Sequence, residues 1–304
     1  MLRLHDACLS PLPHPARVDA VIGQPVDTQL LQDTGLYPAL QPWLADGGAP
    51  SEWLLNTIPG LRALAKAYVD TPGSTNLGTF RLLLARARLR AQGNPVVVVS
   101  PALQNLLAAT PLSRALTLDC LRSPSPLLYI AFARPNPWRI SNALPGLHEC
   151  EGAYLGQFTV APGQPLFEQA ARARGLGLDP RRPAHVLEIV VTGSPVGKRH
   201  ALDDASCDIV LIYQDEREPL PQMLERHFAW YARAAASEIP LHTPLPDGEI
   251  ARLRPIIQQL ALVLLYINLG EPATLRAIQG SDLLLALRRL GADEGVTFAT
   301  ADRL

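Results

Sequence analysis

Two apolar segments near the middle of the chain constrain the fold most. Ala184–Thr192 and Cys207–Tyr213 are rich in Val, Ile and Leu, which is typical of buried strands. Only about 14 residues connect them, and these residues are mostly polar. A parallel pair would need a crossover of roughly a dozen or more residues with an apolar face that packs on the sheet. We therefore expect the two strands to be antiparallel neighbours.

Three more strands are predicted upstream of this pair, at residues 95–100, 127–133 and 150–160. The first contains four consecutive valines, which suits a strand covered on both faces. The 29 prolines argue against a long helical bundle and for short elements joined by rigid loops. The pattern predicts an α+β fold: a mixed, partly antiparallel sheet with helices on one side and a helical C-terminal layer.

Helices are predicted at about 60–70, 74–92, 101–108, 165–174, 220–237, 249–269 and 281–290. Ser100 and Pro101 suit the start of the third, and Gly93 the end of the second. The helix at 249–269 is the most apolar, and Pro255 either kinks it or marks its true start. Its residues Ile257, Leu260, Leu264 and Ile267 have the spacing of a buried face.

The proline-rich stretch 122–126 is the best boundary within the chain. It divides the sequence into a proline-rich N-terminal arm at 1–50, a mainly helical part at 51–122 and a mixed sheet-and-helix domain at 123–304. A single continuous domain at 51–304 is the alternative.

The compartment follows from the cysteines and the apolar runs. The four cysteines form no C-x-x-C pair, so we expect reduced, buried thiols rather than a zinc site or a redox motif. Nothing at the N-terminus resembles a signal peptide. The longest uninterrupted apolar run, 261–267, has seven residues, whereas a membrane-spanning helix needs about 20. We expect a cytoplasmic protein with no membrane partner.

Charge is balanced overall and uneven locally. The net charge is −1, which argues against a strongly basic nucleic-acid binder. However, residues 54–118 carry a net +6 and residues 203–249 a net −7. We expect these blocks to pair within one chain, with helix 74–92 lying against helix 220–237. Arg86 or Arg90 would then approach Glu218 or Glu225.

The candidate catalytic residues are His148, Glu149 and Glu151, in the run His-Glu-Cys-Glu. A histidine beside two carboxylates offers a general acid and base. His200 and Asp204 could complete such a site. The alternative is a polar entrance to a strand. The residues and their spacing predict neither a cofactor nor a metal site.

Two further motifs are rejected on chemical grounds. Gly193–Lys198 resembles a phosphate-binding loop, but it is one residue too short and lacks the following Ser or Thr. It also leaves no room for a helix before the next strand. Ser100 follows a strand but lacks the glycines of a nucleophile elbow, so we assign it to capping the next helix.

Nucleic-acid binding is a separate hypothesis, based on Arg81, Arg86, Arg88 and Arg90 of the helix at 74–92. At 100° per residue, Arg81 and Arg88 share one ridge and Arg86 and Arg90 the opposite one. The helix therefore has basic flanks rather than a single basic face. No aromatic residues alternate with these arginines, as a single-strand binding surface would require.

Three stretches together carry a resemblance: PLLYIAF at 126–132, EGAY at 151–154 and LALVLLY at 260–266. They resemble uncharacterised accessory proteins encoded on plasmids and prophages of proteobacteria, over about residues 124–269. The resemblance implies a bacterial, cytoplasmic protein associated with mobile elements. It implies no catalytic residues.

The leading hypothesis is a non-enzymatic accessory or regulatory protein of a bacterial mobile element that acts by binding a macromolecule, in the first place a protein. One alternative is an enzyme, a hydrolase or transferase, with its site near His148–Glu151. The other is a nucleic-acid-binding protein that uses Arg81–Arg90. The sequence leaves open whether the protein has catalytic activity.

Overall fold

The structure is a computed structural model, and it describes residues 12–16, 58–63, 77–141, 147–164, 175–195, 205–233 and 248–269, together with residues 38, 51, 54, 167 and 168. The helix predicted at 281–290 lies outside these residues, as does most of the N-terminal arm. The helices predicted at 60–70 and 165–174 are described only in part.

A mixed sheet of six strands forms the centre of the described chain. Its strands run in the order β1-β2-β4-β5-β6, and β3 also pairs with β4. Only β1 and β2 are parallel. The antiparallel pairing of β5 with β6 confirms the prediction from the short polar link. The strands are β1 (Val96–Val98), β2 (Leu127–Ala131), β3 (Arg139–Ser141), β4 (Leu147–Val160), β5 (Ala184–Pro195) and β6 (Ala205–Tyr213).

Two details of the sheet differ from the prediction. Strand β3 lies in a segment for which no strand was predicted, because three residues are too few to show a periodic pattern. The valine run was expected to be covered on both faces. Instead β1 stands at the end of the described sheet, and the side chain of Val98 is 47% exposed.

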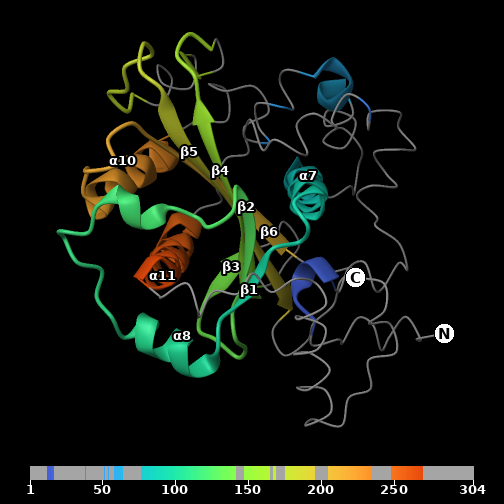
Figure 1. Cartoon of the computed structure of the whole chain (residues 1–304). Helices are drawn as coiled ribbons and strands as arrows, with labels where there is room; N and C mark the ends of the chain where they lie inside the picture. Colours follow the sequence, from blue (N-terminus) through green and yellow to red (C-terminus); the bar gives the residue numbers. More distant parts are fainter. Residues whose placement is uncertain are drawn as a thin grey trace.

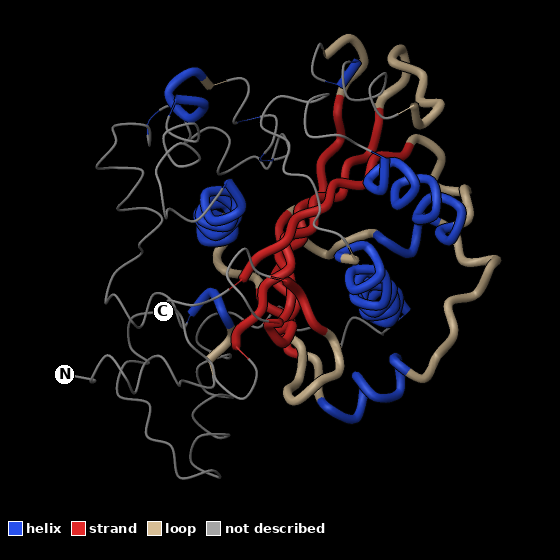
Figure 2. The backbone as a smooth tube through the Cα atoms, turned by 180° about the vertical axis from the view of Figure 1, so that it is seen from behind, coloured by secondary structure: helices blue, strands red, loops and turns tan. Residues whose placement is uncertain are grey.

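Helices lie on both faces of the sheet (Figures 1 and 2). The helix α7 (Leu77–Ala91) packs on one face, and α10 (Leu220–Arg233) and α11 (Glu249–Leu269) cover the other. The α+β class is confirmed. The position of α7 departs from the expectation that the helices would lie on one side.

Each face has its own apolar core. The larger core joins β2, β4, β5 and β6 to α10, α11 and the short elements α8 (Pro101–Ala108) and η1 (Leu118–Leu121). The smaller core lies under α7 and includes Tyr129, Tyr154 and Val190. Side chains alternate between the two faces along each strand, so both faces of the central strands are buried.

The local helix signals act as predicted. The Ser100 hydroxyl accepts a hydrogen bond from the backbone N–H of Leu103 at 3.3 Å and caps α8, with Pro101 in its first turn. The helix α7 ends before Gly93, whose φ of 82° only glycine adopts easily. Pro255 lies inside α11, six residues after its first residue.

Two side chains of α10 cover the free edge of β6. The hydroxyl oxygen of Tyr231 accepts a hydrogen bond from the N–H of Val210 at 2.8 Å. Nε2 of His227 accepts one from the N–H of Ile212 at 2.9 Å. These N–H groups point away from β5, so α10 satisfies edge donors that would otherwise be open to pairing.

The predicted contact between helices 74–92 and 220–237 is wrong. The helices α7 and α10 lie on opposite faces of the sheet (Figure 1). Glu218 instead pairs with Arg226, and Glu225 pairs with Arg254. Two acids of this block are therefore paired with arginines of α10 and α11, and no sequence pattern identified these two arginines.

The described sheet contains strands from both sides of the proline-rich stretch 122–126. Strand β1, from the part before this stretch, pairs with β2 from the part after it. A domain boundary between residues 122 and 123 stays a prediction.

The helix α11 is the centre of the larger core. By length and composition it could cross a membrane, but so could the core helix of a soluble protein. Ile257, Leu260, Leu264 and Ile267 are all at most 3% exposed, which confirms the predicted buried face.

We expect Leu264→Ala to reduce the free energy of unfolding by about 2–5 kcal/mol, because it leaves a cavity among fully packed neighbours. Urea unfolding followed by circular dichroism measures this loss. Tyr266→Ala, on the exposed side of the same helix, should change the free energy by no more than about 0.5 kcal/mol. A loss under about 1 kcal/mol for Leu264→Ala would show that α11 is peripheral.

Candidate functional site

The predicted catalytic carboxylates lie in a buried ion-pair cluster. Glu149 and Glu151, both on β4, accept hydrogen bonds from the two ends of the Arg134 guanidinium at 2.8 and 2.6 Å. Each of these three side chains is at most 9% exposed. Arg134 therefore pairs with both carboxylates inside the protein.

Asn136 completes this cluster and fixes the loop between β2 and β3. Its backbone N–H donates to Glu149 at 2.7 Å, and its side-chain amide donates to the carbonyl oxygen of Cys150 at 2.8 Å. Burial alone would raise the pKa of Glu149. The hydrogen bonds from Arg134 and Asn136 outweigh this effect, so that the pKa lies below its usual value. The carboxylate is thus held ionised as part of the loop's structure.

His148, the third predicted catalytic residue, is not brought to an open surface. His148 is buried between β3 and β5, where it lies opposite Ile140 and Pro195. His200 and Asp204 lie outside the described residues. Among the residues that the structure describes, no three His, Cys, Asp or Glu side chains gather as metal ligands.

Gly193, the first residue of the rejected phosphate-binding loop, has a structural role in β5. It lies opposite Cys150 of β4, and a Cβ at this position would lie 2.8 Å from the carbonyl oxygen of Glu149. A larger residue would push the two strands apart. Residues 196–199 lie outside the described chain.

Arg88, one of the predicted nucleic-acid contacts, is completely buried. Its guanidinium lies 3.4 Å from Glu188 of β5 and 4.4 Å from the ring centre of Phe158. The Ser51 N–H and hydroxyl donate to the same carboxylate at 2.9 and 3.1 Å. Burial lowers the pKa of Arg88 to about 10, although Glu188 opposes this shift.

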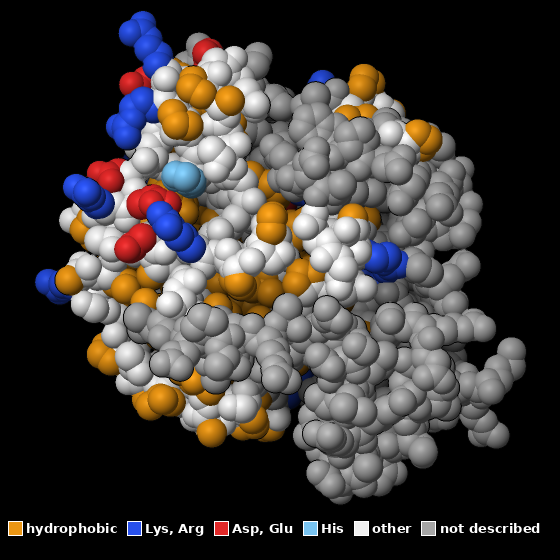
Figure 3. Space-filling view, in the orientation of Figure 1, with side chains coloured by type: hydrophobic (Ala, Val, Ile, Leu, Met, Phe, Trp, Pro, Cys, Tyr) orange, Lys and Arg blue, Asp and Glu red, His pale blue; other side chains and the backbone are white. Residues whose placement is uncertain are grey.

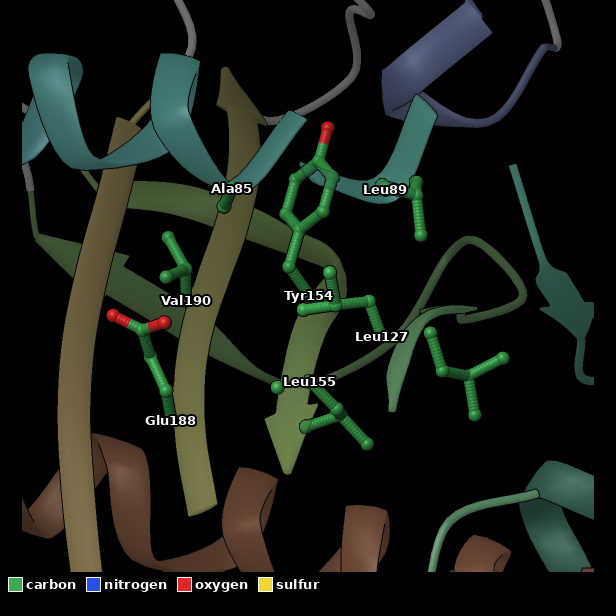
Figure 4. A pocket seen from close by; sticks show the side chains of 9 residues that line it. Ala85, Leu89, Leu127, Tyr154, Leu155, Glu188 and Val190 are labelled. Carbon is green, nitrogen blue, oxygen red and sulfur yellow. The ribbon is translucent and has the colours of Figure 1, made fainter. Parts of the chain in front are cut away.

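A narrow cavity of about 10 Å³ lies beside this pair, between α7 and the sheet. Figure 4 shows the Glu188 carboxylate near Val190 and below Ala85 of α7, with Tyr154 on the next strand. The cavity is about the size of one water molecule, so it cannot serve as a ligand site.

The remaining arginines of α7 do not form an exposed basic row. Arg86 is 2% exposed, and Arg90 is partly buried. Arg81 lies on the first half of the helix, and its side chain is not described. A nucleic acid could reach Arg88 only if α7 left the sheet.

Three of the four cysteines are described, and all three are free and buried, as expected. Burial raises the pKa of Cys120 to about 12 and also raises that of Cys150. These thiols are packing residues rather than nucleophiles. Cys8 lies outside the described residues.

The described surface has two grooves large enough to receive a side chain of another molecule. One, of about 310 Å³, is polar and lies at the ends of β4, β5 and β6. Its cation Arg122 is already paired with Glu216 at 2.6 Å, and His185 stacks on Tyr213. In the view of Figure 3, acidic and basic side chains are mixed on the left side of the molecule.

The second groove, of about 280 Å³, lies between α8 and α11. Its walls carry no charged side chain. They are formed by residues 107–112, at the end of α8 and just after it, by Trp138, and by Pro255, Gln258, Gln259 and Leu262 of α11. Leu106, on the same short helix, is 64% exposed.

An uncharged groove beside an exposed leucine favours an apolar protein segment as its ligand. An ionic group would lose its hydration there without gaining a partner. Apolar surface that stays exposed on a folded protein often marks an interaction site. We call residues 107–112 with Trp138, Pro255, Gln258, Gln259 and Leu262 the α8–α11 groove, and we treat it as the candidate binding site.

Sequence reasoning missed this groove because its residues come from three separate segments. Leu107, Trp138 and Leu262 are each typical core residues, and only their packing leaves a hollow between them. Leu103, Leu106 and Leu107 have the i, i+3, i+4 spacing of one helix face, so no pattern in the sequence indicated that Leu106 stays exposed.

The comparisons with known proteins agree with a binding role. A model of the AcrVA2-like family, described as the anti-CRISPR type V subtype A2 family, matches residues 97–280. This range is more than half of the chain and contains the whole α8–α11 groove. No curated protein and no solved structure matches the chain.

We expect Glu149→Gln to lower the free energy of unfolding by about 1.5–3 kcal/mol at pH 7, the size of a hydrogen bond to a charged group. In the folded state the pKa of Glu149 lies below the value of about 4.3 that a glutamate has in an unfolded chain. The contribution is therefore present above about pH 4.3 and is lost as the pH falls below it.

Urea unfolding from pH 7 to about pH 3 compares this variant with the natural chain. The difference in free energy should narrow toward the acid end. A difference that stays constant or widens would show that ionised Glu149 does not stabilise the fold.

We expect the described cysteines to resist a thiol reagent while the protein is folded. In a Cys8→Ser background at pH 8, Ellman's reagent should react with no thiol within minutes, because burial keeps Cys120 and Cys150 protonated. In denaturant, three thiols per chain should react. Fast reaction of one thiol in the folded protein would identify an exposed, reactive cysteine.

Proposed function

The chain belongs to the anti-CRISPR type V subtype A2 family and is an accessory protein of mobile elements, and on this premise we propose that it acts by binding a protein component of a type V CRISPR system. It does so without catalysis. The source that the resemblance suggests, a proteobacterial plasmid or prophage, and a cytoplasmic location remain part of the proposal. The free, buried cysteines support a reducing compartment.

One observation carries the choice of a protein partner: the walls of the α8–α11 groove have no charged side chain. Nucleic acid binds mainly through several Lys and Arg contacts to phosphates, which such a groove lacks. Arg86 and Arg88, two of the four arginines of the nucleic-acid hypothesis, are buried. The groove can instead receive leucine or aromatic side chains of a protein, the residues that anchor many interfaces.

The buried cluster around Arg134 supports a non-catalytic mode of action. A general acid or base must reach its substrate, and Glu149 and Glu151 are enclosed and already hydrogen-bonded. The enzyme hypothesis requires this cluster to open. A binding protein needs it only as a rigid support, and β4 carries that support within the central sheet.

Gln258→Glu tests the groove with the smallest change, because it adds a charge to the wall with almost no change in shape. We expect the affinity for the purified type V effector protein to fall at least tenfold, because the new carboxylate would be buried by the partner. Gln222→Glu, the same change at an exposed position of α10, is the matched control. Biolayer interferometry measures both.

The stoichiometry separates binding from catalysis. Inhibition of target-DNA cleavage should increase in proportion to the protein added and reach its maximum near one chain per effector. Complete inhibition at a hundredfold lower ratio would support an enzyme. Equal affinities for the two glutamate variants would place the binding surface elsewhere, and binding to the guide RNA alone would exclude the protein partner.

A further inference from the structure

The two edge strands of the described sheet, β1 and β6, differ in how their outward main-chain groups are hydrogen-bonded. At β6 the outward N–H groups of Val210 and Ile212 donate to side chains of α10. At β1 no element covers the edge in this way in the described part of the chain. The side chain of Val98 is 47% exposed, and Ser100 after it is exposed as well.

The register of β1 identifies the groups that face outward. Pro95 and Val99 form hydrogen bonds with β2, through the carbonyl oxygen of the first and the N–H of the second. Alternate residues of a strand bond to opposite neighbours, so the N–H and C=O of Val98 point away from β2. Among the described residues, these two groups form no hydrogen bond.

The edge extends one residue beyond the strand. Ser100 has extended backbone angles, φ −67° and ψ 152°, and its N–H follows the same alternation as that of Val98. The chain then turns into α8 at Pro101. The open edge therefore offers the N–H and C=O of Val98 and the N–H of Ser100 in a row.

We propose that the edge Val98–Ser100 adds a short extended segment of the protein partner to the sheet, beside the α8–α11 groove. Such strand addition uses main-chain hydrogen bonds for affinity and side-chain pockets for specificity. This inference rests on the proposed function for the identity of the partner, but it concerns a different surface and a different kind of contact.

A second copy of this chain is a less suitable ligand for the β1 edge than a segment of the protein partner. The edge is about three residues long, or roughly 10 Å. Two such strands cannot bury the roughly 1,200 Å² that a stable interface needs. The shortness of β1 and the prolines at 95 and 101 also limit pairing between identical edges.

A partner that is also bound in the α8–α11 groove does not depend on the short edge alone for its buried area. The eight residues of α8, about 12 Å in length, lead from the open edge to the groove (Figure 1). A segment next to the bound part of the partner reaches the edge at a high effective concentration. The exposed residues between the two surfaces, which include Pro101, Ala102 and Leu106, carry no charge.

Amide hydrogen exchange of the natural chain tests the edge directly. In the free protein the amides of Val98 and Ser100 should exchange quickly, while those of Val97 and Val99 are protected by β2. In the complex with the purified type V effector protein, the Val98 and Ser100 amides should slow at least tenfold. A complex in which both amides exchange as fast as in the free protein would overturn the inference.

Val98→Pro provides a second measurement, since it removes the outward N–H and leaves the bonds of Val97 and Val99 to β2 intact. We expect at least tenfold weaker binding with an unchanged circular dichroism spectrum. Val98→Ala keeps the N–H and should bind within about threefold of the natural chain. Equal affinity of the proline and alanine variants would contradict strand addition.

The failure of this inference can be told apart from failure of the proposed function. Without the proposed function, the natural chain does not bind the effector protein at all. Without strand addition, the natural chain binds, Gln258→Glu weakens the complex, and the amides of Val98 and Ser100 remain unprotected. If Val98→Pro does not fold, the exchange data of the natural chain decide the question.

Discussion

The fold depends on β4, the one strand that pairs with three others. It is antiparallel to β2 and β3 on one side and to β5 along nearly its whole length on the other. Its side chains enter both cores, since Leu155 faces the larger core and Tyr154 the core under α7. A shift of one residue in this pairing would exchange the two faces and move Glu149 and Glu151 away from Arg134. The ion-pair cluster and the strand register therefore fix each other.

Arg134 shows why a cluster of acidic residues is ambiguous in sequence. Glu149 and Glu151 have the composition of a catalytic pair, and their burial would support that role if they were alone. The cation that pairs with both lies 15 residues before the first of them, in a segment with no regular pattern. Removing one buried partner generally costs about 3–5 kcal/mol, so such clusters persist for structural reasons without any catalytic function. The same argument applies to Arg88 and Glu188, which are 100 residues apart in sequence.

Local signals predicted the fold better than the arrangement of its parts. The short polar link before β6, the Ser100 cap and the buried face of α11 all depend on neighbours in sequence, and the structure confirms them. The face of the sheet that α7 covers is determined by the whole topology. The arginines of α7 were expected on two basic flanks, whereas Arg88 is buried and held by the distant residues Glu188, Ser51 and Phe158. For the candidate site, the sequence supplied the leucines of α8 but not the hollow that they form with Trp138 and α11.

The two sheet edges illustrate how a binding protein can be selective with few charged contacts. Covering β6 with His227 and Tyr231 prevents pairing where the strand is nine residues long and aggregation would be easiest. The open edge at β1 is too short to pair strongly by itself, because a few main-chain hydrogen bonds contribute only about 0.5–1.5 kcal/mol each. It becomes effective only when another contact holds the partner nearby. The α8–α11 groove is in the right place for that contact, so a partner would have to fit both surfaces at once, and a protein that fits one of them would bind weakly.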